Sequence, residues 1–83
     1  MKFKAIIDIL PREELLDPQG KTVANNLHNV DIDGVQDVRI GKHIIMRFTA
    51  DSEAQANDKV ENACKKLLAN TIMETYSYSI ESA

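Results

Sequence analysis

The sequence predicts an α+β fold, a ferredoxin-like β-α-β-β-α-β sandwich in which a four-stranded antiparallel sheet carries two helices on one face. Strand-like and helix-like patterns alternate in that order along 83 residues, and we expect a single domain over residues 1–83. The first and third strand patterns carry apolar residues on both faces, as the middle strands of a sheet in the order 4-1-3-2 would.

The first predicted strand covers residues 3–10 and stops at Pro11, which has no N–H to donate. The first helix is expected to begin at Asp17-Pro18, because an aspartate can cap the first-turn N–H groups and proline fits the first helical position. Its narrow apolar stripe consists of Val23, Ala24, Leu27 and Val30. Gly20 lowers helix propensity by about 1 kcal/mol relative to alanine, so it marks either fraying or the close approach of another backbone.

A β-hairpin is predicted over residues 35–48, with Gly41-Lys42 as a two-residue type II′ turn. In that register Val38 would face Ile45, and Val35 would face Phe48. Apolar residues would then lie on both faces of the ribbon.

The second helix is expected to begin near Asp51, because Ser52 and Gln55 have capping-box spacing. Its apolar stripe is the clearest helical pattern in the chain and consists of Ala56, Val60, Ala63, Cys64, Leu67 and Leu68. The last strand is predicted over residues 71–80.

The predicted fold has more apolar sheet surface than two helices on one face can cover. The other face is therefore expected to serve oligomerisation. Chain length supports this expectation, because domains of this size usually need a disulfide, a metal or a partner. Cys64 is the only cysteine, which excludes an intrachain disulfide and a cysteine-based zinc site.

Composition argues against several classes of partner. The formal net charge is −3, with acidic and basic residues interspersed, whereas nucleic-acid-binding domains usually have a basic face. No apolar run is long enough to span a membrane, and residues 1–4 lead into a strand rather than a signal peptide. We therefore expect no nucleic acid, no membrane and a cytoplasmic location.

Motifs for catalysis are missing from the chain, and we predict no catalytic and no metal-binding residue. Arg12 could hold an acyl phosphate, but it stands beside two glutamates without a glycine-rich nest. Cys64 lies on an apolar stripe and is expected in the core. His28 and His43 lack the spacing of metal ligands. The pattern is typical of a module that binds or assembles.

Three segments, in this order, resemble the PurS family, the small subunits of phosphoribosylformylglycinamidine (FGAM) synthase. The first is Leu16-Asp-Pro-Gln-Gly20 with the following Lys21-Thr-Val and Asn26-Leu-His28. The second is Val35-Gln-Asp-Val-Arg-Ile-Gly-Lys42. The third is Cys64-Lys-Lys-Leu-Leu-Ala-Asn70 with Ile72 and Glu74-Thr-Tyr76. Together they cover most of the chain.

The resemblance implies a role in de novo purine (IMP) biosynthesis. The enzyme of this family is a glutamine-dependent C–N ligase that converts FGAR to FGAM with ATP, Mg and glutamine. The resemblance implies that this chain itself binds none of the three. The resemblance implies that the chain bridges a glutaminase subunit and a large ATP-dependent synthetase subunit, and that it self-associates as a dimer or tetramer. The alternative is a small regulatory domain of the amino-acid-sensing type.

Six residues of the matching motifs are candidates for contacts with partner subunits: Asp17, Gln19, Gly20, Arg39, Gly41 and Lys42. Capping and turn geometry already account for Asp17 and Gly41. Neither capping, core packing nor turn geometry requires Gln19, Arg39 or Lys42. These three polar side chains are therefore the sharper prediction of a partner interface.

Overall fold

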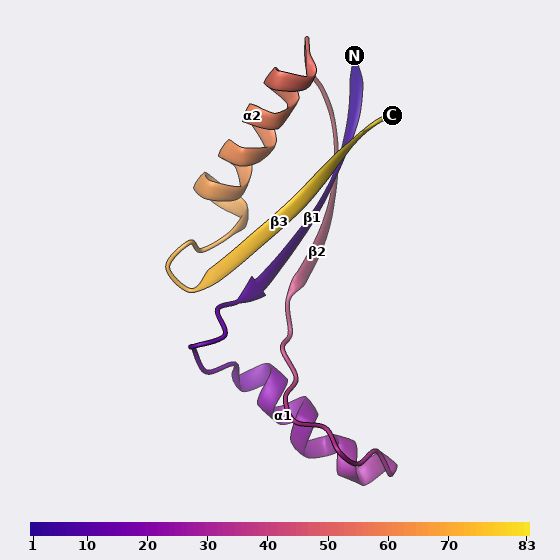
Figure 1. The fold of residues 1–83 in the computed structure, drawn as a ribbon, viewed down its shortest axis with the longest axis vertical. Helices are drawn as coiled ribbons and strands as arrows, with labels where there is room; N and C mark the ends of the chain where they lie inside the picture. Colours follow the sequence, from indigo (N-terminus) through magenta and orange to yellow (C-terminus); the bar gives the residue numbers. More distant parts are fainter.

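The computed structural model describes all 83 residues and shows a sheet with one helix on it and a helical arm beyond it (Figure 1). The sheet contains β1 (Lys2–Pro11), β2 (Lys42–Thr49) and β3 (Glu74–Ser82). All pairs are antiparallel, in the order β2-β1-β3. The helices are α1 (Pro18–Leu27) and α2 (Glu53–Ala63).

The central position of β1 explains why its residues are apolar on both faces. Ile7 lies opposite Ile44 on β2 and Tyr78 on β3, on the face toward α2. Ile6 lies opposite Ile45 on the other face. The order of these three strands agrees with the predicted sheet, apart from its missing edge strand.

The core lies between the sheet and α2. Its largest fully buried side chains are Ile7, Ile9, Val60 and Cys64. A second cluster at the other end of the sheet contains Phe3, Ala50 and Ala56. Ser52 caps α2 by accepting a hydrogen bond from the Gln55 amide at 3.1 Å, which confirms the predicted start of this helix.

The predicted stripe of α2 fails at its last turn, where Leu67 is 82% exposed. The helix widens into a π-helical turn at Cys64–Leu68, with the Ala69 amide donating to the Cys64 carbonyl. Because a π turn spaces its hydrogen bonds by five residues instead of four, it shifts the phase of the side chains. Leu67 is thereby turned away from the sheet.

The prediction of a four-stranded sheet with a tight turn at Gly41-Lys42 is wrong for this chain, whose sheet has three strands. Residues 35–40 form no strand and run beside α1 before β2 begins. Gly34, not Gly41, is the glycine with positive φ. Gly41 instead passes the β1 backbone so closely that a Cβ would lie 2.2 Å from the Ile9 carbonyl oxygen.

The placement of both helices on one sheet face is also wrong. Only α2 covers the sheet, while α1 and the segment behind it form an arm that continues past its end (Figure 1). The molecule measures 50 × 26 × 15 Å, and its radius of gyration is 16.4 Å. A compact chain of this length has a radius of about 12 Å. Neither helix has the length and apolar character needed to cross a membrane.

Candidate functional site

The base of the arm brings together two of the three motifs singled out from the sequence. We call this cluster the arm base and define it as Asp17, Gly20 and residues 38–40. The Asp17 carboxylate accepts from the Gly20 amide at 3.1 Å and from the Ile40 amide at 2.7 Å. These two hydrogen bonds, that with Ile40 first, hold the pKa of Asp17 below its usual value. Asp17 therefore caps α1 and fastens the returning chain to it.

Gly20 allows the backbone of the returning segment to lie against α1. A Cβ at this position would be 1.9 Å from the Val38 carbonyl oxygen, a distance at which one backbone must move. Of the two explanations predicted from the sequence, close approach is the correct one, and fraying is not needed.

Arg39 connects the arm to the linker that follows β1. Its two terminal nitrogens donate to the carbonyl oxygens of Arg12 and Leu15, each at 2.8 Å. Its Nε is buried without a hydrogen-bond partner, and the nearest carboxylate oxygen, on Asp37, is 3.9 Å away. The guanidinium thus holds two segments in place and keeps one donor unused.

The other three candidate residues lie around the arm base. Gln19 is exposed and borders a shallow apolar hollow with Pro18, Thr22, Val23 and Ile40. Gly41 passes β1, as described above. Lys42 opens β2, with its side chain 59% exposed and its Nζ 3.9 Å from Glu74. Gln19 and Lys42 are therefore accessible, and their contact with a partner stays a prediction.

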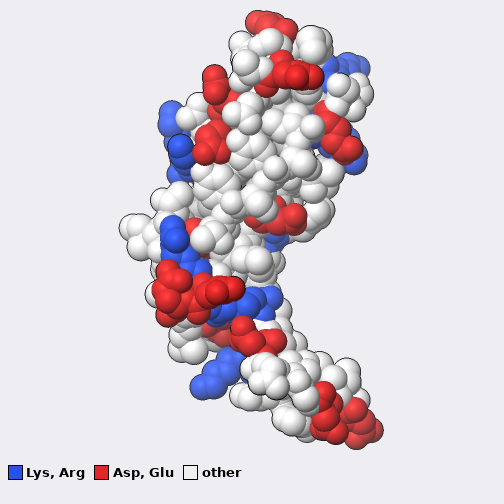
Figure 2. All heavy atoms as spheres, in the orientation of Figure 1, with Lys and Arg blue, Asp and Glu red and all other residues white.

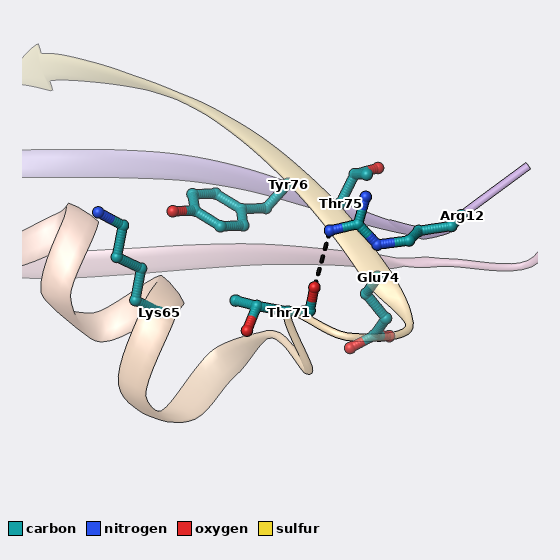
Figure 3. Close-up of a pocket in the computed structure, with 6 residues that line it drawn as sticks. All are labelled: Arg12, Lys65, Thr71, Glu74, Thr75 and Tyr76. Atoms are coloured by element: carbon teal, nitrogen blue, oxygen red, sulfur yellow. Dashed lines mark hydrogen bonds between the residues drawn. The ribbon is translucent and has the colours of Figure 1, made fainter.

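A pocket of about 480 Å³ was not anticipated from the sequence. It lies where the linker after β1 meets the start of β3, and it is lined by Arg12, Lys65, Thr71, Glu74, Thr75 and Tyr76 (Figure 3). Arg12 donates to the Thr71 carbonyl at 2.7 Å and to the Ile72 carbonyl at 3.1 Å. Its guanidinium is thus occupied by backbone, which argues against the acyl-phosphate site.

Two stacked tyrosines fasten α2 to β3. Tyr76 donates to Glu61 at 3.0 Å, and Tyr78 donates to Asn57 at 3.0 Å. Burial, followed by the nearby Glu61 carboxylate, raises the pKa of Tyr78 to about 12. The tyrosine hydroxyls in turn lower the pKa of Glu61. Both hydroxyls are therefore used within the chain.

The sheet face away from α2 is open. It carries Ile6 and Ile45 as a cross-strand pair, with Leu10 farther along β1. Ile45 is 41% exposed and Leu10 is 48% exposed. Asp8 and His43 form a 2.5 Å contact beside them.

Figure 2 shows acidic and basic atoms interspersed on the visible side of the molecule, with no extended basic area. No cluster of His, Cys, Asp or Glu suited to a metal is present.

Comparison with known proteins gives one consistent result. Residues 4–82 match the family model PurS, described as phosphoribosylformylglycinamidine (FGAM) synthase. The PurS subunit of this synthase from Bacillus subtilis is 41% identical over 79 residues, which cover 95% of this chain and 93% of the relative. The subunit from Synechocystis is 42% identical over 69 residues, which cover 83% and 69%.

Solved structures agree over almost the whole chain. The Bacillus subtilis PurS crystal structure has a TM-score of 0.85 at 39% identity and covers 96% of this chain and 99% of that one. A chain from the structure of PurLQS from Thermotoga maritima has a TM-score of 0.87 at 31% identity, with 98% and 99% covered. The fold with a three-stranded sheet and an extended arm is therefore similar to experimental PurS folds over almost the whole chain.

Proposed function

Because the chain belongs to the PurS family of FGAM synthase, a glutamine-dependent ligase of purine biosynthesis, we propose that it serves that enzyme as a non-catalytic assembly subunit. The similarity to a chain of the Thermotoga maritima PurLQS complex carries this proposal. The family match favours a subunit over the amino-acid sensor considered from the sequence.

In this role the chain bridges the glutaminase subunit and the ATP-dependent synthetase subunit. Ammonia released from glutamine reaches the synthetase, where FGAR becomes FGAM with ATP and Mg. Three side chains that could do chemistry are engaged within the chain: Arg12 binds backbone carbonyls, and Tyr76 and Glu61 bind each other. This engagement supports a positional role. A cytoplasmic location stays a prediction.

Self-association is the second part of the proposal. The open sheet face presents Ile6, Leu10 and Ile45, and α2 leaves this face uncovered. We expect this face to pack against a second copy, because burying exposed apolar area yields roughly 25 cal/mol per Å². The same exposed apolar surface would favour a dimer or a tetramer.

For the contacts with the catalytic subunits, Gln19 and Lys42 are the residues to test first. Both are exposed, so changing them leaves the fold of this chain undisturbed. Arg39 is a poorer probe, because its guanidinium holds the linker and the arm together. We expect Lys42→Glu to weaken copurification with the two catalytic subunits, with Lys66→Glu, at another exposed lysine, as control.

The deciding experiment is a reconstitution of the synthase from its separate subunits. Glutamine-dependent formation of FGAM is measured for the two catalytic subunits with and without this chain, and ammonia-dependent formation is measured alongside. We expect the chain to be required for the glutamine-dependent reaction and much less for the ammonia-dependent one. Full glutamine-dependent activity in its absence would refute the proposal.

A further inference from the structure

The loop that joins α2 to β3, residues 67–73, holds large apolar side chains in water. Leu67 and Ile72 are each 82% exposed, the highest fraction of any large apolar side chain in the molecule. Met73 is also exposed, and beside it lies a shallow hollow bordered by the exposed Leu16 of the linker. Figure 1 shows this loop at the end of the sheet nearest the arm. A group of exposed apolar residues of this kind is typical of a contact surface.

The loop is ordered by a dense set of hydrogen bonds. The Asn70 carbonyl accepts from the amides of Met73 and Glu74, at 3.0 and 2.7 Å. The Asn70 side chain accepts from the Ile72 amide at 3.1 Å. Arg12 donates through its side chain to two carbonyls of the loop, and its amide donates to the Met73 carbonyl at 2.9 Å. Because the loop is fixed in advance, binding through it costs little conformational entropy.

The pocket of about 480 Å³ beside this loop offers a place for a negative charge. Arg12 and Lys65 come from opposite sides of it (Figure 3). The Nη1 of Arg12 donates to no group of this chain, since the loop uses only Nε and Nη2. Lys65 is paired with Glu61 at 3.4 Å, an exposed pair that contributes little. Glu74, the only carboxylate that lines the pocket, accepts from the Asn70 amide at 2.8 Å. A carboxylate from a partner would therefore meet two cations.

A second copy of this chain fits the loop poorly. An isologous contact centred on the loop would bring Arg12 and Lys65 against the same cations of the other copy, which is unfavourable. The exposed Glu13 and Glu14 follow on the linker, but they do not line the pocket. The loop also continues from α2, which covers the sheet face opposite to the open one (Figure 1). Contact through the loop and self-association through the open face can therefore occur together.

We propose that Leu67 and Ile72 insert into an apolar hollow on a catalytic subunit of the synthase, and that a carboxylate at the rim of this hollow enters the pocket between Arg12 and Lys65. The apolar contact supplies affinity, and the charge contact sets the orientation. Lys42 lies at the same place, with its Nζ 3.9 Å from Glu74. This inference rests on the subunit role proposed above and names the surface that serves it.

Substitutions of exposed side chains test the proposal. Affinity for each catalytic subunit is measured by biolayer interferometry with the unmodified chain and its variants. We expect Leu67→Asp and Ile72→Asp each to bind one of the two subunits at least about tenfold more weakly, because a charge then enters an apolar contact. Lys65→Gln should weaken binding to the same subunit about threefold or more and make it less sensitive to added salt.

The matched controls keep either the apolar surface or the pocket. Ile72→Val should bind within about twofold of the unmodified chain, because it stays apolar. Lys66→Glu changes an exposed lysine that does not line the pocket, and it should also bind within about twofold. Light scattering should show the same self-association for Ile72→Asp as for the unmodified chain. Loss of self-association in this variant would assign the loop to the contact between copies and overturn the proposal.

Two outcomes separate this inference from the subunit role itself. If the unmodified chain binds a catalytic subunit and both aspartate variants bind equally well, the loop is not the contact surface and the subunit role stands. If the unmodified chain binds neither subunit, both proposals fail. Amide exchange at Ile72 and Met73 should slow at least about tenfold when the unmodified chain binds, a result that requires no variant to fold. Unchanged exchange there would overturn the contact.

Discussion

A single carboxylate, that of Asp17, determines how the arm joins its own helix. One oxygen caps α1 and the other holds the Ile40 amide, twenty-three residues along the chain. The cap was predictable from the Asp-Pro start of the helix. The bond to Ile40 was not, because no local pattern indicates which distant amide a capping carboxylate also reaches.

We expect Asp17→Asn to lower stability at neutral pH, because the amide loses the charge that both backbone donors favour. The pKa of Asp17 is lowered in the folded state from its ordinary value of 3.8, so its contribution is present above that value. It is lost as the pH falls through the folded-state pKa. Urea unfolding at pH 7 and pH 3 should show a difference between variant and parent that narrows at pH 3. A constant difference would contradict this account.

The Tyr78 hydroxyl supplies a second, alkaline test. Its pKa is raised from 10 to about 12 in the folded state, first by burial and then by Glu61, so the folded protein favours the protonated form. The resulting stability is complete below pH 10 and is lost as the pH rises toward 12. Titration by ultraviolet absorbance should show delayed ionisation, and Tyr78→Phe should reduce the fall in stability between pH 10 and 12. Ordinary ionisation near pH 10 for both tyrosines would contradict the proposed burial of their hydroxyls between α2 and β3.

At the scale of elements, the strands and α2 follow from local pattern, whereas the arm does not. The apolar pattern identified β1, and capping-box spacing identified the start of α2. Residues 35–40 are rich in β-branched residues as well, but composition alone cannot say what such a segment pairs with. Gly41 resembles a turn residue in sequence, although its real constraint is contact with the Ile9 backbone. The candidate site was thus recognisable by resemblance, and its geometry was not.

We expect Gly20→Ala to loosen the arm. In an open helix this change would stabilise by about 1 kcal/mol, but here the methyl group meets the Val38 carbonyl. Forced shifts of this kind cost about 1–3 kcal/mol, so the clash should outweigh the gain in helix propensity and the variant should be less stable. Amide exchange in α1 should speed up while that in β1 changes little. Asn25→Ala, at an exposed position of the same helix, is the control: it raises helix propensity without a clash and should not speed up exchange in α1.

The shape of the whole molecule predicts that its stability depends on concentration. Only 11 of 83 residues are buried, and the chain is far more extended than a compact domain, so a single copy removes little apolar surface from water. Association would bury the remainder and stabilise the folded state by mass action. We therefore expect the melting temperature to rise by several degrees between about 1 and 100 μM chain. Ile45→Lys, which places a charge on the open face, should abolish that rise while leaving the far-ultraviolet circular dichroism spectrum intact. A melting temperature that does not change on dilution, at concentrations where light scattering shows dissociation, would mean that the monomer is stable without the second copy.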